Sequence, residues 1–265
     1  MRILLTGASG NLGSLILSKL STKYEWVLAD FKIPLFTYGH PFFQVNLSEF
    51  NTLYSLCSKV EMVIHLAACA SPEAKWDDLI EPNIKGVYNV LEAAYQSKCQ
   101  RVIFASSIHV VDGYPREMQL YPSMPPNPLS LYGATKAWGE ALAAYYAYQK
   151  NLPVICLRLG WVKAHNDLTL FPNNPHLNII LTDRVFVRLI VASIETPFTQ
   201  KFGIYHGISN NQFKRLDITS TREVLGYQPQ DDAFAIAKQN NRNPIRLWIN
   251  VLKKVFGSMT KHFSK

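Results

Sequence analysis

Hydrophobic residues along this chain form short unbroken runs that alternate with stretches of helical periodicity. The runs are apolar at successive positions, as in strands that are covered on both faces. The intervening stretches repeat their apolar positions every three or four residues, as amphipathic helices do. Strands are predicted at residues 2–6, 25–30, 61–66, 101–106 and 154–159, and helices at about 11–20, 48–58, 78–97 and 131–149.

This alternation predicts repeated βα units. Such units build an α/β fold with a doubly wound parallel sheet, because right-handed crossovers place helices on both faces of the sheet. Pro- and Asn-rich stretches at 115–129 and 171–178 are predicted to be loops over the carboxyl edge of the sheet.

The formal net charge of +8 is unevenly distributed along the 265 residues. Residues 1–232 hold 20 Lys and Arg against 19 Asp and Glu, whereas residues 233–265 hold seven Lys and Arg and no acid. A body so close to neutrality offers no basic surface for a phosphate backbone, so nucleic-acid binding is not expected.

The basic segment at 238–265 has a pattern of its own. Over residues 245–263, aromatic and aliphatic positions recur at helical spacing with cationic residues between them, which predicts a basic amphipathic helix. We expect its apolar face to pack on the protein body or on a second subunit. The alternative is peripheral membrane contact, with the same face lying in anionic lipid.

The cysteines are scattered, and neither a signal peptide nor a spanning helix is evident. Cys57, Cys69, Cys99 and Cys156 include no close pair, which argues against a zinc site or a disulfide framework. Reduced thiols in a cytoplasmic protein are therefore expected, with no metal.

A glycine-rich turn joins the first strand to the first helix and reads Thr-Gly-Ala-Ser-Gly-Asn-Leu-Gly over residues 6–13. Its glycines allow a tight turn, close approach of a pyrophosphate and close packing of helix on strand. The helix N-terminus then offers unpaired N–H groups to phosphate. The expected cofactor contacts here are Gly7, Gly10, Asn11, Leu12 and Gly13.

Asp30 ends the second strand, 20 residues after Gly10. A carboxylate at this place accepts hydrogen bonds from ribose hydroxyls and repels a 2′-phosphate, which favours NAD over NADP. Two further pairs at the same sheet edge are expected to flank the adenine and ribose: Asn46 with Leu47, and Ala67 with Ala68, which follow the strand at 61–66. His65 lies within an apolar run, so we interpret it as a core histidine.

Ser107 follows the strand at 101–106, and Tyr132 and Lys136 lie four residues apart at the start of a helix. That spacing places Tyr132 and Lys136 on one helical face. A phenol titrates near pH 10, and an ammonium one turn away is expected to lower that pKa. Tyr132 could then remove a hydroxyl proton while Ser107 holds the substrate oxygen.

Taken together, these motifs resemble those of extended short-chain dehydrogenases/reductases of the NAD-dependent epimerase/dehydratase family. The resemblance covers about residues 1–237. It implies a Rossmann fold, NAD as cofactor, a catalytic role for Ser107, Tyr132 and Lys136, and contact of Tyr132 and Lys136 with the cofactor. The residues that carry it are Thr6 to Gly13, Asp30, His65 to Ala68, Asn83 to Gly86, Ser106 and Ser107, Tyr132 to Lys136, and Leu157 with Arg158.

Within that family the chain is most similar to uronate dehydrogenases, which implies a sugar or sugar acid as substrate. The similarity rests on residues 105–109, 114–116, 130–133, 207–211 and 225–232. It implies substrate-binding elements mainly in 161–215, in a small C-terminal part. The chain departs from the pattern at Ile108, where those enzymes have an amide residue, and in the stretch 171–182, which lacks their carboxylate-binding arginine.

Four further residues have two interpretations each. Ser71 and His109 are candidate substrate contacts, but an ordinary loop serine and a packing histidine are equally compatible with the pattern. Asn83 is expected to be structural first and a proton-relay member second. Trp161 is expected to be a core aromatic, with a place in the pocket wall as the alternative.

The leading functional hypothesis is an NAD-dependent oxidoreductase acting on a sugar or sugar acid. A nucleotide-sugar epimerase or dehydratase is the second, and net release of NADH separates the two. A third is a non-catalytic NAD-binding protein tethered by its basic tail. Family members are often dimers, so a homodimer is a further implication of the resemblance.

Overall fold

The computed structural model describes residues 1–242 and is built around one parallel sheet. Seven strands lie in the order β3-β2-β1-β4-β5-β6-β9, and each neighbouring pair is parallel. This order reverses direction between β1 and β4, where open α/β sheets bind their ligands. The strands are β1 (Arg2–Thr6), β2 (Glu25–Asp30), β3 (Phe42–Gln44), β4 (Met62–His65), β5 (Arg101–Ser107), β6 (Val154–Leu159) and β9 (Phe202–Gly207).

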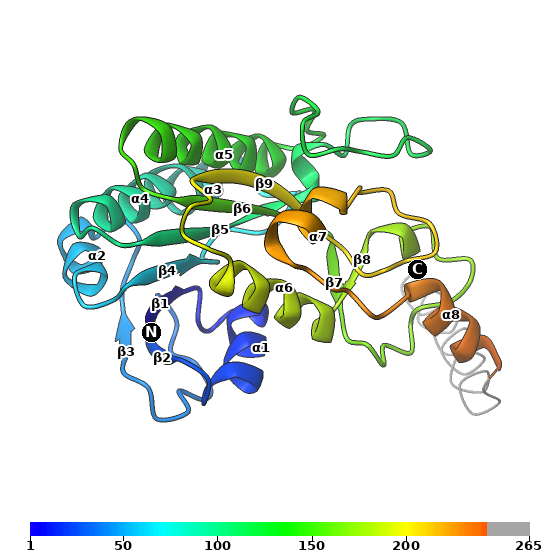
Figure 1. Ribbon diagram of the computed structural model, residues 1–265, viewed down its shortest axis with the longest axis horizontal. Coiled ribbons are helices and arrows are strands. Elements are labelled where there is room, and N and C mark those ends of the chain that lie inside the picture. Colours follow the sequence, from blue (N-terminus) through cyan, green and yellow to red (C-terminus); the bar gives the residue numbers. More distant parts are fainter. Residues whose placement is uncertain (243–265) are drawn as a thin grey trace, which may run out of the picture.

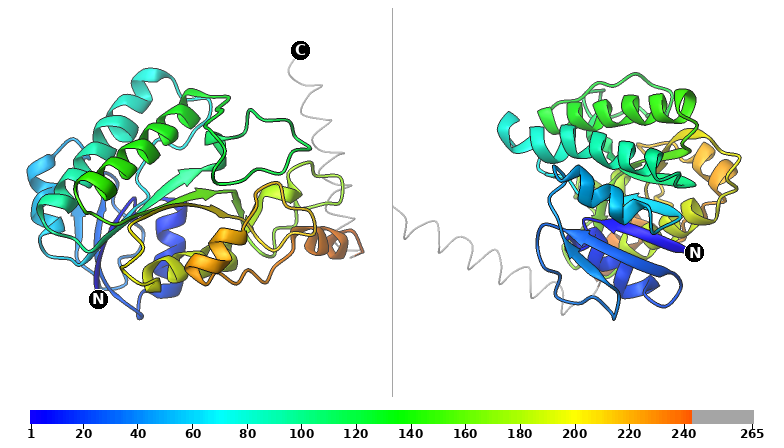
Figure 2. Two further views of the ribbon diagram at one scale, coloured as in Figure 1. Left: turned by 45° about the horizontal axis from the view of Figure 1, so that its top comes forward. Right: turned by 90° about the vertical axis from the view of Figure 1, so that its left-hand side faces the viewer.

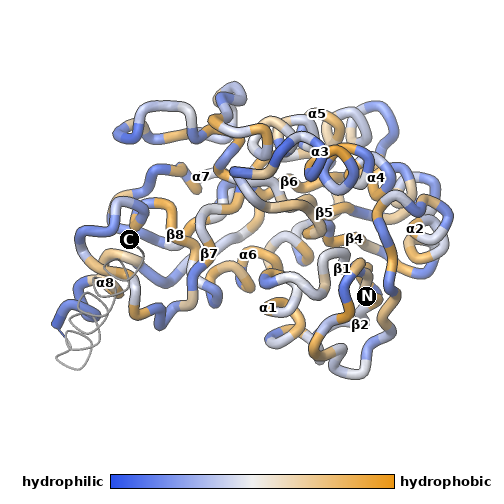
Figure 3. Tube along the Cα trace, turned by 180° about the vertical axis from the view of Figure 1, so that it is seen from behind, coloured by the Kyte–Doolittle hydropathy of each residue, from blue (hydrophilic) through white to orange (hydrophobic). Residues whose placement is uncertain are grey.

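Helices cover both faces of the sheet, as Figures 1 and 2 show. One face carries α2 (Phe50–Cys57), α4 (Gly86–Gln96) and α5 (Leu131–Gln149), and the other carries α1 (Asn11–Leu20) and α6 (Asp183–Glu195). The predicted doubly wound fold is therefore confirmed. Each face has its own buried apolar cluster, and hydrophobic positions run along the central strands (Figure 3).

The C-terminal part adds a second, two-stranded sheet beyond the end of β6. It pairs β7 (Trp161–Lys163) with β8 (Ile180–Thr182), and α7 (Thr219–Leu225) and α8 (Ala233–Arg242) follow later in the chain. The boundary expected at residue 237 falls inside α8. The basic segment predicted as a helix over 245–263 lies outside the described residues.

The predicted helix at 78–97 is interrupted in the structure. It consists of α3 (Trp76–Leu79), a π-helical turn (Ile80–Lys85) and α4. Pro82 has no N–H to donate, and the N–H of Gly86 donates to the carbonyl of Glu81, five residues earlier. This wider turn carries Asn83, whose side chain is buried.

Within residues 1–242, no helix is long and apolar enough to cross a membrane.

Candidate active site

The glycine turn packs against the loop that follows β4. Gly7 has φ +76°, and a Cβ there would lie 2.6 Å from the backbone nitrogen of Ala67. A Cβ on Gly13 would overlap the carbonyl oxygen of Gly7. The turn therefore needs glycine at both positions. Because glycine has no side chain, the backbone of the turn is left bare, that is, uncovered by side chains from these positions, at the start of α1.

The first N–H groups of α1 have no side-chain cap. The helix begins after Gly10, whose position has no side chain to occupy those donors. Asn11 and Leu12 follow, so their N–H groups face the edge of the sheet at the positive end of the helix. This arrangement fits a pyrophosphate.

Asp30 lies beside the turn, and its carboxylate is ordered by two backbone donors. The N–H of Ser9 donates to Oδ2 at 2.9 Å, and the N–H of Lys32 donates to Oδ1 at 3.0 Å. Each carboxylate oxygen keeps a further lone pair, which ribose hydroxyls can use. With the bare turn, Asp30 makes these residues fit a dinucleotide.

The other predicted cofactor residues occupy the same edge, with different surroundings. Ala67 and Ala68 lie half-buried in the loop beside Gly7. Asn46 is exposed, and its Oδ1 accepts from the N–H of Ser48 within its own turn. Leu47 is buried and packs in the apolar cluster beneath α2 and α4.

His65 is a core residue, as expected from its apolar surroundings. Its ring is 1% exposed, Nδ1 lies 2.7 Å from Oγ1 of Thr6, and the ring stacks on Phe104. Burial, together with the charge of Lys136, lowers its pKa to about 3. The ring is therefore neutral at ordinary pH.

Ser107 and Tyr132 meet at the carboxyl end of β5. Both are 7% exposed, and Tyr132 is the second residue of α5. Oγ of Ser107 accepts from the N–H of His109 at 3.2 Å, which holds a short turn between strand and helix. The His109 ring then lies edge-on to Tyr132, with 5.6 Å between centroids. Ser107 and His109, from the end of β5 and its turn, thus form one cluster with Tyr132 of α5.

Lys136 lies below Tyr132 and is almost completely buried. Its ammonium donates to the carbonyl of Ala105 at 2.7 Å and lies 5.8 Å from the centre of the Tyr132 ring. Burial lowers the pKa of Lys136 to about 8, against the opposing effect of Glu140.

The expected lowering of the Tyr132 pKa by Lys136 is not found. Burial raises the pKa of Tyr132 above its usual value, although the Ser107 side chain acts in the lowering direction. Desolvation disfavours the phenolate, and the ammonium of Lys136 is bonded to a carbonyl of β5. In this structure burial outweighs the hydrogen bond with Ser107.

Asn83 joins the loop after β4 to α5. Its Oδ1 accepts from the N–H of Cys69 at 2.8 Å, and its amide nitrogen donates to the carbonyl of Cys69 and to the hydroxyl of Thr135, both at 3.0 Å. Thr135 precedes Lys136. The side chain therefore connects the loop beside the glycine turn to the helix that carries Tyr132.

Glu140 and Arg158 form a buried ion pair that the sequence analysis missed. The two side chains are 4% and 2% exposed and meet at 2.8 Å. Arg158 was predicted only as part of a family motif, and no role was predicted for Glu140. The spacing of Tyr132, Lys136 and Glu140 at four-residue intervals was the available signal.

The predicted substrate side has no free arginine at the expected place. Arg184 is the first arginine after the stretch 171–182, and its guanidinium donates to Asp231 at 2.7 and 3.3 Å. Ile108 is buried in an apolar cluster, and Ser71 lies in an exposed loop where its hydroxyl accepts from the backbone N–H of Glu73.

Trp161 is 45% exposed, so the prediction that it is a core aromatic is wrong. It lies two residues after Leu159, which pairs in register with Ser107 across β5 and β6. Its ring meets the ring of His176 edge-on, and the ammonium of Lys163 lies 4.3 Å from its centre. The indole therefore stands at the same sheet edge as Ser107.

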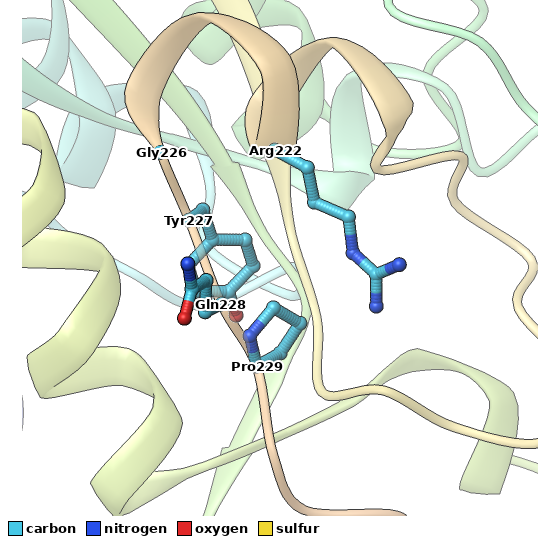
Figure 4. Close-up of a pocket in the computed structure, with 5 residues that line it drawn as sticks. All are labelled: Arg222, Gly226, Tyr227, Gln228 and Pro229. Atoms are coloured by element: carbon cyan, nitrogen blue, oxygen red, sulfur yellow. The ribbon is translucent and has the colours of Figure 1, made fainter.

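One hollow of about 310 Å³ lies at the C-terminal end of α7 (Figure 4). Arg222 and residues 226–229 line it, and the Arg222 guanidinium donates to Oδ1 of Asn210. None of these lining residues is a predicted site residue, so this hollow is not part of the candidate site at the strand ends.

Comparisons with known proteins agree with this geometry. The model of the NAD dependent epimerase/dehydratase family matches residues 3–174. The chain is 31% identical over 249 residues to an NAD-dependent glucose-6-phosphate dehydrogenase from Haloferax volcanii, covering 87% of this chain and 94% of that one. It is 32% identical over 240 residues to a uronate dehydrogenase from Agrobacterium fabrum, covering 89% and 87%.

A solved structure agrees closely as well. The crystal structure of a mutant uronate dehydrogenase from Agrobacterium tumefaciens, complexed with NAD, superposes with a TM-score of 0.80 at 31% identity. The match covers 91% of this chain and 88% of that one.

Proposed function

The chain belongs to the NAD dependent epimerase/dehydratase family, and from this membership we propose that it is an NAD-dependent oxidoreductase acting on a sugar or a sugar acid. The observation that carries the proposal is the cluster of Ser107, Tyr132 and Lys136 at the strand ends beside the bare glycine turn.

The dinucleotide would lie along residues 7–13, with Asp30 on its adenosine ribose and Tyr132 and Lys136 at its other end. Asn46, Leu47, Ala67 and Ala68 would border it at the same sheet edge. When bound, NAD supplies the hydride acceptor. The chain's own residues bind and orient the substrate and move one proton.

Tyr132 acts as the base in this proposal. It removes the proton of the substrate hydroxyl, and the hydride leaves the carbon that carries that hydroxyl. Oxidation at the anomeric carbon would give a lactone. Ser107 donates a hydrogen bond to the same oxygen, and Lys136 supplies positive charge near the phenolate. Burial raises the pKa of Tyr132, so positive charge near the phenolate is needed to favour loss of its proton, and Lys136 can supply it.

Substrate contacts come from both sides of this cluster. His109 reaches Tyr132 directly, and Asp112 holds the His109 ring at 2.5 Å. Ser71 and elements within 161–215 complete the substrate side. Because Arg184 is paired with Asp231, a sugar carboxylate would need a different partner from the arginine of uronate dehydrogenases.

The test is a screen for NADH formation with uronic acids, free aldoses and nucleotide sugars. We expect net NADH from a free sugar or sugar acid, and no turnover by Tyr132→Phe, whose affinity for NAD stays within about threefold. Interconversion of nucleotide sugars without NADH release would replace this function with an epimerase. NAD binding without turnover of any sugar would leave a non-catalytic cofactor-binding protein.

A homodimer is proposed through the outer face of α4 and α5. Large exposed aromatic side chains lie there, and Tyr88 and Trp138 line a hollow of about 430 Å³ with Ile84. Monomeric proteins seldom expose such patches. Sedimentation equilibrium tests the proposal: Trp138→Ser should shift the protein from dimer to monomer, whereas a wild-type monomer rejects it.

The basic segment gives a separate proposal about location. The four cysteines are unpaired, which supports a cytoplasmic protein. For residues 245–263, packing on the protein or on a second subunit remains the leading interpretation, and peripheral membrane contact is proposed as the alternative. Co-sedimentation with phosphatidylglycerol vesicles decides between them, since Trp248→Ser with Phe256→Ser should abolish binding, and wild-type protein that stays in the supernatant excludes the membrane.

A further inference from the structure

One carboxylate of α5 contacts two strands of the sheet. Oε1 of Glu140 accepts a hydrogen bond from the Ser106 hydroxyl at 2.6 Å and one from Nε of Arg158 at 2.8 Å. Oε2 accepts from Nη2 of Arg158 at 2.8 Å. The pair is bidentate and almost fully buried, so its geometry is narrowly defined.

The strand partners of Glu140 are neighbours in the sheet. Ser106 on β5 pairs in register with Arg158 on β6. Ser106 immediately precedes Ser107, and Arg158 immediately precedes Leu159, the register partner of Ser107. A single carboxylate on α5 therefore fixes the two strand ends that border the proposed reaction site.

The same helix contacts β5 one turn earlier through Lys136. Its ammonium donates to Ala105, so consecutive residues of β5 are bonded to consecutive turns of α5. Between these bonds Gly139 lies against the ring of Phe104, since a Cβ there would come within 2.5 Å of it. Helix and strand cannot slide past one another while these contacts persist.

The buried side chains around Glu140 include two cations and one carboxylate. Lys136 and Arg158 are cations, and Glu140 is the one carboxylate among the described residues that bears on the Lys136 charge. The other groups around them are His65 on β4, Tyr132 on α5, Cys156 on β6 and His206 on β9. Burial keeps both histidines neutral and raises the pKa of the Cys156 thiol.

We propose that Glu140 is a positioning residue of this active site, which holds the end of β5 against α5 and supplies a counter-charge to Lys136 beside Tyr132. The inference rests on the proposed oxidoreductase function. Buried ion pairs contribute little net stability compared with apolar pairs of the same shape. What this pair supplies is a fixed geometry between Ser107 and Tyr132 and a counter-charge for Lys136.

The experiment compares Glu140→Gln, Ser106→Ala and a control, Tyr146→Phe. The control removes a hydrogen bond between α5 and Glu92 on α4, at 2.6 Å, and so loosens the same helix away from the site. Each variant is assayed for kcat, KM and NAD affinity per folded molecule. Glu140→Gln should lower kcat by about tenfold with NAD affinity within about twofold, and Ser106→Ala by a smaller factor.

The pH profile supplies the second readout. Glu140 acts to raise the pKa of Lys136, so Glu140→Gln should move the alkaline limb of kcat to lower pH. Tyr146→Phe should leave both kcat and the limb unchanged. A Glu140→Gln enzyme that has the wild-type kcat and the wild-type alkaline limb of the pH profile overturns the proposal. If that variant does not fold, an unchanged kcat in Ser106→Ala overturns it.

Failure of the proposed function is distinguishable from failure of this inference. If the wild-type protein oxidises no sugar, the Lys136 ammonium can be titrated by nitrogen-15 NMR in the free protein. A lower Lys136 pKa in Glu140→Gln than in wild type supports the electrostatic role without turnover. Equal pKa values overturn it.

Discussion

Gly133 lies directly against the backbone carbonyl of His109, so closely that a Cβ on residue 133 would overlap that oxygen. This contact joins the first turn of α5 to the short turn that follows Ser107. The distance between the Ser107 hydroxyl and the Tyr132 phenol therefore depends on a glycine that carries no chemistry itself.

Replacing Gly133 by Ala should damage catalysis more than cofactor binding. The added methyl must push α5 away from the 108–110 turn, so we expect kcat to fall about tenfold or more, with NAD affinity within about threefold. Steady-state kinetics and fluorescence titration measure the two. The matched control is Ala141→Gly, an exposed site on the same helix that costs about 1 kcal/mol without crowding. Equal kcat in both variants would contradict the argument.

Asp30→Asn should weaken NAD more than NADP. The amide keeps the shape of the side chain but loses the negative charge that favours ribose hydroxyls and repels a 2′-phosphate. We expect the NAD dissociation constant to rise about tenfold and its advantage over NADP to shrink. Parallel titrations with both dinucleotides measure this, and an unchanged ratio of the two constants would argue against Asp30 as the ribose ligand.

His206 should make the protein less stable in acid. Its ring is completely buried, and burial and Arg158 lower its pKa from 6.5 to about 3. Between those values the unfolded chain binds a proton that the folded protein does not. The free energy of unfolding therefore falls as pH drops through this window, by up to about 1.4 kcal/mol per pH unit, and is unaffected by this group above it.

Urea unfolding between pH 7 and pH 4 measures the slope. His206→Gln should flatten it relative to wild type, although His65 retains a similar contribution. His40→Gln, in the loop between β2 and β3, is the matched control and should keep the wild-type slope. Equal slopes in all three proteins would disprove the assignment.

Arg101→Met should destabilise the protein and leave its chemistry intact. The buried guanidinium donates to the carbonyls of Ser193, Thr196 and Pro197 at 2.6 to 3.2 Å, where α6 ends. Removing it leaves buried acceptors unsatisfied, at a cost of about 2–4 kcal/mol.

Calorimetry should detect a lower melting temperature for Arg101→Met, with kcat at 25 °C unchanged, because Arg101 begins β5 at the edge opposite the site. Arg188→Met, an exposed change on α6, should preserve both values. A loss of kcat without a loss of stability would show that the two edges of β5 are coupled.

Local patterns predicted the fold and the cofactor side well. The runs at 2–6, 25–30 and 154–159 and the helix at 131–149 match the structure at both ends. Their signals are continuous in sequence, since covered strands are uniformly apolar and the glycine turn lies between a strand and a helix. The Rossmann arrangement follows from such units.

What the sequence could not reveal depends on contacts between distant residues. Glu140 and Arg158 are 18 positions apart, and Asn83 and Thr135 are 52 apart, so only the folded sheet brings each pair together. Trp161 is a large aromatic residue of the kind that is often buried, but in β7 it lies exposed at the sheet edge. The pKa of Tyr132 was misjudged because desolvation depends on burial, which helical spacing does not report.

The backbone contacts of the glycine turn also limit how this enzyme could be redesigned. Gly7 and Gly13 are each closed in by backbone atoms, so neither can accept a side chain that would select another cofactor. Asp30 and Lys32, by contrast, lie outside the glycine positions: Lys32 is exposed, and the Asp30 carboxylate accepts the backbone N–H groups of Ser9 and Lys32. An engineer seeking a new cofactor preference has two positions to vary, and the rest of that loop must be kept as it is.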